Sequence, residues 1–151
     1  IRDSVDGVPV TEFCDRKCLM QRERLELFLQ VCEGVQHAHQ KGIIHRDIKP
    51  NNVLVDDQQG QPIAKVIDFG IAKAIGEPLS DTPRVTMEGQ IVGTPEYMSP
   101  EQASGSASSG VDTRSDVYAL GVLLYELLTG TLPFDSRELR KEGLGAIESV
   151  I

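Results

Sequence analysis

The chain has 151 residues, of which 40% are hydrophobic and 25% are charged, and its formal net charge is −8. This size and composition fit one globular domain, or a large piece of one. The acidic balance argues against nucleic acid or an anionic membrane surface as the main partner. No apolar run is long enough to span a bilayer and no signal peptide is apparent. We therefore expect a cytoplasmic segment without membrane contact, although a longer parent protein could carry an anchor elsewhere.

The first helical pattern covers residues 21–40, after an aperiodic stretch, residues 1–19, expected to form a loop with a short helix at most. Lys41-Gly42 is a typical helix end. His37 and His39 lie two positions apart and point in different directions, so a shared metal ion is not expected. The apolar face of this helix is predicted to comprise Leu25, Phe28, Leu29, Cys32, Val35 and His39.

Three cysteines, Cys14, Cys18 and Cys32, are too few for a complete set of disulfides. The Cys14-x3-Cys18 pair has no second ligand pair nearby, which argues against a zinc site. Free thiols in a reducing compartment are the simplest interpretation.

Short strands are expected after the first helix. Ile43-Ile44 and Val53-Leu54-Val55 flank a polar loop, and the polar cluster at residues 56–62 predicts a hairpin that returns through residues 64–67. Residues 71–110 are polar and poorly periodic, which favours either a long functional loop or a linker between domains.

A second helix is predicted at residues 113–129, so apolar that burial nearly all round is expected, and Gly130 ends it. Two further short helices are predicted at 135–140 and 146–151.

The polar loop His45-Arg46-Asp47-Ile48-Lys49-Pro50-Asn51-Asn52 resembles the catalytic loop of protein kinases, with Lys two and Asn five positions after Asp. Three more motifs follow in the order of that family: Asp68-Phe69-Gly70, then Gly93 to Glu101, which resembles the end of the activation segment, then Asp112 to Gly121, which resembles the start of the central helix. Lys49 and Gly93-Thr94 resemble the Ser/Thr-specific branch, and the residues that make up the motifs resemble those of bacterial serine/threonine kinases.

The resemblance implies transfer of phosphate from ATP, with Mg²⁺, to Ser or Thr hydroxyls of a protein substrate. Asp47 would orient the substrate hydroxyl, and Lys49 would neutralise charge on the transferring phosphoryl group. Thr94 would bond to Asp47 and Lys49. Asn52 and Asp68 would give oxygen ligands to Mg²⁺, and Leu54 would contact the adenine.

The same resemblance assigns supporting roles. His45 would pack against Phe69 rather than act as a base, and Asp116 would accept hydrogen bonds from the backbone of the catalytic loop. Arg46 would bind a phosphorylated residue of the activation segment. Candidates are Ser80, Thr82 and Thr86, of which Thr86 is preferred.

The Gly-rich loop, strand lysine and partner glutamate of the family have no counterpart in residues 1–151. We expect an α+β fold, the mainly helical C-terminal lobe of a kinase with a small β-hairpin that carries the catalytic and metal-binding loops, without the N-lobe. Residues 1–151 would be a partial kinase domain containing the hinge region, catalytic loop, activation segment and central helix, inactive alone.

The alternatives are a non-catalytic, pseudokinase-like binding module or a truncated gene product. A small-molecule kinase of related fold is a third possibility, but Arg46, Lys49 and Ser99-Pro100-Glu101 count against it.

Overall fold

The computed structural model describes residues 7–58, 60–69, 84–85, 91–92, 94–103 and 112–134. The helices predicted at 135–140 and 146–151, and the candidate phosphorylation sites Ser80, Thr82 and Thr86, lie outside these ranges. Among the described helices, none has the length and apolar character needed to cross a membrane.

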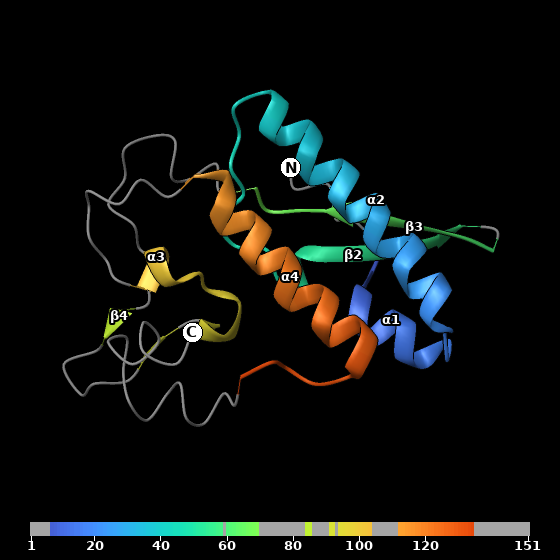
Figure 1. The fold of residues 1–151 in the computed structure, drawn as a ribbon. Coiled ribbons are helices and arrows are strands. Elements are labelled where there is room, and N and C mark those ends of the chain that lie inside the picture. Colours follow the sequence, from blue (N-terminus) through green and yellow to red (C-terminus); the bar gives the residue numbers. More distant parts are fainter. Residues whose placement is uncertain are drawn as a thin grey trace.

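The helices are α1 (Val10–Arg16), α2 (Gln21–Gln40), α3 (Pro100–Ala103) and α4 (Thr113–Thr129), with short 3₁₀ turns η1 (Pro50–Asn52) and η3 (Pro95–Tyr97). The strands are β1 (Val8–Pro9), β2 (Val53–Gln58), β3 (Gln61–Val66), β4 (Arg84–Val85) and β5 (Ile91–Val92). In Figure 1, α2 and α4 lie side by side next to the β2–β3 hairpin, and α1 lies near the end of α4. The core between them includes Leu27, Val31, Val53, Val55, Leu123 and Leu127.

The first sheet has the order β1-β2-β3, with antiparallel pairing throughout. Gln58 pairs with Gln61, and Gly60 has a φ of 80°, so the hairpin closes through a tighter turn than the sequence predicted. Sequence patterns also missed β1, because a two-residue strand leaves no period to read. The strand predicted at Ile43-Ile44 is wrong: these residues form no strand.

Helix α2 has the predicted bounds, and of its predicted apolar face Val35 is buried and Phe28 packs against the core, but the face is rotated at Leu25 and Leu29. Its buried residues are Leu27, Val31, Val35 and Ala38, whereas Leu25 and Leu29 are 40% and 60% exposed. Eight of the 20 residues of this helix are hydrophobic, and they are spread over more than one narrow face, so their spacing fits two rotations about the helix axis. Packing against β3 and α4 selects one of them.

Helix α4 matches its predicted bounds, and Gly130, with a φ of 73°, ends it as expected. Asp112 begins the helix as its N-cap, with its side chain accepting from Arg114 N. Burial nearly all round is not observed: Val117 is 62% and Tyr125 45% exposed.

Arg24 joins three helices at the end of the molecule remote from the polar loop. Its guanidinium donates to the carbonyl oxygens of Leu127 at 3.1 Å and Leu19 at 3.0 Å, and to Asp15 Oδ1 at 2.8 Å. The side chain is only 16% exposed. Arg24 therefore satisfies carbonyls near the ends of α1 and α4 that those helices leave without partners of their own.

Candidate active site

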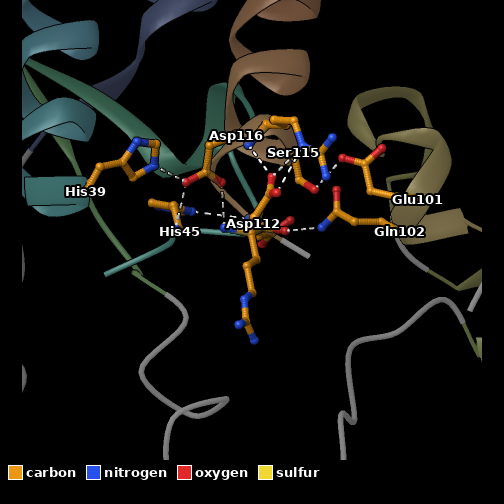
Figure 2. Close-up of polar contacts among 10 residues, drawn as sticks. His39, His45, Glu101, Gln102, Asp112, Ser115 and Asp116 are labelled. Carbon is orange, nitrogen blue, oxygen red and sulfur yellow. Dashed lines mark hydrogen bonds and ion pairs between the residues drawn. The ribbon is translucent and has the colours of Figure 1, made fainter. Parts of the chain in front are cut away.

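The backbone of the polar loop, residues 45–52, is anchored by the side chain of Asp116 in α4, which is 1% exposed. Asp116 Oδ2 accepts from His45 N at 2.9 Å, and Oδ1 accepts from Arg46 N at 2.8 Å (Figure 2). The prediction that Asp116 would accept hydrogen bonds from the backbone of this loop is confirmed. A carboxylate is suited to this position because hydrogen bonds to a charged acceptor are stronger than neutral ones.

His39 of α2 adds a third hydrogen bond to the same carboxylate. Its Nε2 lies 2.7 Å from Asp116 Oδ2, and the side chain is 18% exposed. The sequence placed His39 on the predicted apolar face of this helix and gave it no polar partner. The two partners are 77 positions apart in the chain, so no local pattern could have paired them.

His45 is fully buried and uses both ring nitrogens. Nε2 lies 2.9 Å from the carbonyl oxygen of Ile67, and Nδ1 accepts from Asp47 N at 3.2 Å. These partners assign the proton to Nε2, because a carbonyl can only accept and an amide can only donate. The ring also contacts Phe69, with 4.7 Å between centroids. The predicted packing of His45 against Phe69 is confirmed.

Asp47 lies at the exposed edge of the loop, with a side chain that is 52% exposed. Lys49 Nζ donates to both carboxylate oxygens, at 2.8 and 3.1 Å. Asn52 Nδ2 donates to Asp47 Oδ2 at 2.9 Å and to the Asp47 carbonyl at 2.7 Å. The structure thus brings three of the predicted site residues together around one accessible carboxylate.

The hairpin brings the fourth residue, Asp68, back towards this cluster. Val53 pairs with Val66, and Ile67 N donates to the carbonyl of Asn52 at 2.9 Å, so the residue before Asp68 is bonded to Asn52. Asp68 itself is exposed. The hairpin predicted between the catalytic loop and Asp68-Phe69-Gly70 is confirmed.

The two remaining predicted site residues, Leu54 and Thr94, differ in burial and in the elements that carry them. Leu54 is half-buried and pairs with Pro9 and Lys65, on the face of the sheet opposite to buried Val53 and Val55. Thr94 is exposed and precedes η3. Its predicted hydrogen bonds to Asp47 and Lys49 are not formed between these described residues.

Two site residues have left-handed backbone, Arg46 with a φ of 68° and Asp68 with a φ of 55°. Side chains other than glycine rarely adopt this region, and such strain persists only where surrounding contacts enforce it. At Arg46 both backbone groups are held: its N–H by Asp116 and its carbonyl by Gln102 Nε2 at 2.9 Å. Strain of this kind is typical of sites that need one fixed geometry.

The segment that follows Thr94 is fixed to α4 at two points. Ser115 Oγ donates to Glu101 Oε1 at 2.6 Å, and the Tyr97 hydroxyl donates to Glu126. Burial opposes ionisation of Glu101, but hydrogen bonds from Ser115, from its own backbone and from Ser99 outweigh it and lower the pKa of Glu101. Burial and the bond to Glu126 raise the pKa of Tyr97.

The donor set fits a magnesium ion that is shared with a phosphate ligand. Asn52 commits its amide nitrogen to Asp47, which leaves Oδ1 as the acceptor atom of that side chain, and Asp68 offers a carboxylate. Across the described part of the chain, no three His, Cys, Asp or Glu side chains gather into a cluster that could hold a metal. Mg²⁺ commonly takes one or two protein oxygens and completes its shell with phosphates and water.

Comparison with known proteins gives a consistent family. Residues 1–150 match the protein kinase domain family. The chain is 53% identical over 108 residues to serine/threonine-protein kinase pkn3 of Myxococcus xanthus, covering 71% of this chain and 19% of that protein. It is 44% identical over 147 residues to Pkn1 of Myxococcus xanthus, covering 97% of this chain and 19% of the relative.

PknB of Mycobacterium leprae is 41% identical over 135 residues, which cover 89% of this chain and 20% of that protein. The chain therefore spans about a fifth of the length of the curated relatives that it matches.

Proposed function

The chain belongs to the protein kinase family, and from this premise we propose that the protein carrying it transfers the γ-phosphate of ATP to Ser or Thr hydroxyls of other proteins. The observation that carries this proposal is the Asp47 carboxylate, half-exposed at the loop edge and held by both Lys49 and Asn52. Relatives named serine/threonine kinases support the choice of hydroxyl.

Asp47 orients the attacking hydroxyl and accepts its proton. A positioned carboxylate contributes typically about 10²–10⁴-fold by such proton transfer. Lys49, which lies against the same carboxylate, offsets the negative charge of the transferring group. Thr94 lines the place of the substrate residue.

Asn52 and Asp68 would hold Mg²⁺ through oxygen atoms. Leu54, on the face of the sheet opposite to Val53 and Val55, would form a wall for the adenine. The bound ion supplies charge neutralisation on the phosphates. Asp68 follows β3 by two residues and has a left-handed backbone, and β3 pairs with β2, which begins directly after Asn52; this supports a shared site for the two side chains.

We further propose that residues 1–151 form most of the C-terminal lobe, from the hinge region through the catalytic loop and activation segment to the central helix α4. The support is that all four motifs are C-lobe motifs and that the Gly-rich loop and strand lysine are not found among these residues. The 151-residue chain alone is then inactive. Transfer by this isolated chain at a rate near that of the full-length protein would refute the proposal.

Radiolabelled phosphate transfer by the full-length protein tests the reaction, with Asp47→Asn as the matched variant. Peptides carrying Ser, Thr or Tyr, and small-molecule alcohols, serve as alternative acceptors. Transfer to Ser or Thr peptides that depends on Asp47 supports the proposal. Equal rates in both proteins would reject Asp47 as the catalytic group, and no transfer by either would favour a non-catalytic, pseudokinase-like binding module.

Regulation through Arg46 is part of the proposal. No hydrogen bond or ion pair joins the Arg46 guanidinium to another residue in the described ranges, so it can bind a phosphate on the activation segment, with Thr86 preferred over Ser80 and Thr82. Mapping of phosphorylated residues after incubation with ATP tests this. An active kinase whose segment stays unmodified would contradict it.

A further inference from the structure

Gln102 of α3 connects the catalytic loop to the segment that begins at Thr94. Its Nε2 donates to the carbonyl oxygen of Arg46 at 2.9 Å (Figure 2). Its Oε1 accepts from Ser99 N at 3.2 Å and from Ser99 Oγ at 3.1 Å. Ser99 is fully buried. Because the Ser99 amide can only donate, Oε1 must face Ser99, and Nε2 must face Arg46.

The carbonyl that Gln102 holds belongs to the peptide unit that leads into Asp47. Arg46 C=O and Asp47 N–H share one rigid plane. Gln102 holds this plane at the oxygen, and His45 Nδ1 accepts from the nitrogen at 3.2 Å. The orientation of this plane, together with the φ angle of Asp47, determines the direction in which the Asp47 side chain leaves the backbone.

This orientation of the peptide also requires an unfavourable backbone conformation at Arg46. Arg46 has a φ of 68°, a left-handed conformation that residues other than glycine adopt only at a cost in free energy. Asp116 holds the N–H of Arg46, and Gln102 holds its carbonyl. Removal of either contact frees one side of a strained residue directly before Asp47.

We propose that Gln102 is a positioning residue for the phosphoryl transfer, acting through the Arg46–Asp47 peptide to set the direction of the Asp47 carboxylate. This inference rests on the proposed function. It also assigns Gln102 the coupling of Asp47 to the Thr94–Ser99 segment, because Ser99 fixes the orientation of the same amide. Ala103, not Gln102, is the buried residue of α3, so the side chain of Gln102 contributes to geometry more than to the core.

Two variants separate these contacts. Gln102→Met keeps the volume and removes both polar ends, whereas Gln102→Glu keeps an acceptor for Ser99 and sets an oxygen against the Arg46 carbonyl. Gln36 is exposed on α2, and its side chain makes no hydrogen bond to any described residue, so Gln36→Met and Gln36→Glu are the matched controls.

In the full-length protein, both Gln102 variants are expected to lower kcat about tenfold or more, with KM for ATP and peptide within about threefold, since misplacement of a reacting group by about 1 Å can cost about 100-fold. The Gln36 variants keep the wild-type kcat. An unchanged kcat in both Gln102 variants, or a loss confined to KM, would overturn the inference.

Hydrogen–deuterium exchange provides a readout that does not need activity. Faster exchange is expected for a peptide covering residues 45–52 in both Gln102 variants, and for no such peptide in the Gln36 variants. Absence of phosphate transfer by the wild-type protein would count against the proposed function alone. Unchanged exchange in a folded Gln102 variant would count against the positioning role, whether or not the protein is a kinase.

Discussion

Asp47 and Asp116 are two carboxylates at the same loop: Asp47 belongs to the loop, and Asp116 supports its backbone from α4. Asp116 is 1% exposed and accepts from His39, His45 N and Arg46 N. Asp47 has a side chain that is 52% exposed and is held only at its edge, by Lys49 and Asn52. A buried carboxylate with its lone pairs occupied can support a structure but cannot reach a substrate, whereas an exposed one can do chemistry. The environment, not the residue type, separates the two roles.

The contrast extends to the residues between them. His45 is buried against Phe69, with both ring nitrogens in use, and Arg46 follows directly in a left-handed conformation. The backbone therefore passes from a fully bonded interior to an exposed edge within three residues. Variants of either carboxylate should separate activity from stability.

The largest expected effect is on activity, in Asp47→Asn. We expect phosphate transfer by the full-length protein to fall about 10²–10⁴-fold, because the amide cannot accept a proton. The melting temperature should change little, since the side chain is half-exposed and Asn keeps an oxygen for Lys49. Steady-state kinetics measures the rate of phosphate transfer, and calorimetry measures the melting temperature. A variant that lost stability in proportion to activity would remove the distinction drawn above.

Asp116→Asn should show the opposite balance, with a large loss of stability. One of its two acceptor atoms becomes a donor that faces buried N–H groups, which costs roughly 3 kcal/mol of unfolding free energy. Urea denaturation measures this loss. Asp112→Asn, at the N-cap of the same helix, is the control, because Asn and Asp cap helices equally well. Equal destabilisation by the two variants would contradict the buried role of Asp116.

Arg24→Met tests whether buried hydrogen bonding matters equally far from the loop. The carbonyls of Leu19 and Leu127 lose their charged donor, so we expect a loss of roughly 2 kcal/mol in unfolding free energy, with kcat unchanged at temperatures where the protein stays folded. Arg22→Met is the control: Arg22 is 90% exposed and pairs with Glu26, an interaction worth about 0.5 kcal/mol or less. Losses of the same size would mean that burial does not distinguish the two arginines.

The smallest expected effect is the pH dependence at Glu101. Its pKa in the folded protein lies below the ordinary value of 4.5. The unfolded chain therefore binds a proton more readily, so this contribution to stability is complete above pH 4.5 and is lost as pH falls through the folded pKa. Glu101→Gln and Ser115→Ala should both flatten the acid side of the stability curve. Curves parallel to wild type below pH 5 would show that the Ser115 contact does not stabilise the ionised form.

Several features of the site could be predicted from local sequence. The polar cluster at residues 56–62 between two apolar runs predicted the hairpin, and apolar periodicity located α2 and α4 at their observed bounds. These predictions succeed because turns and helices depend on residues close in the chain. The roles of Asp47, Lys49, Asn52 and Asp68 in catalysis stay predictions until they are measured.

The residues that sequence reasoning missed depend on partners far along the chain. His39 meets Asp116 across 77 positions, Gln102 meets Arg46 across 56, and Arg24 meets Leu127 across 103. The predicted face of α2 was wrong at Leu25 and Leu29 for the same reason, since the leucines of this helix are compatible with two rotations until β3 and α4 are in place.

The sequence alone determined the order and spacing of the chemical groups, because covalent order fixes which residues share a loop. Only the tertiary structure decided which groups are buried and which are exposed. Burial depends on neighbours that the chain brings together after folding, and it is burial that makes Asp116 a support and leaves Asp47 accessible.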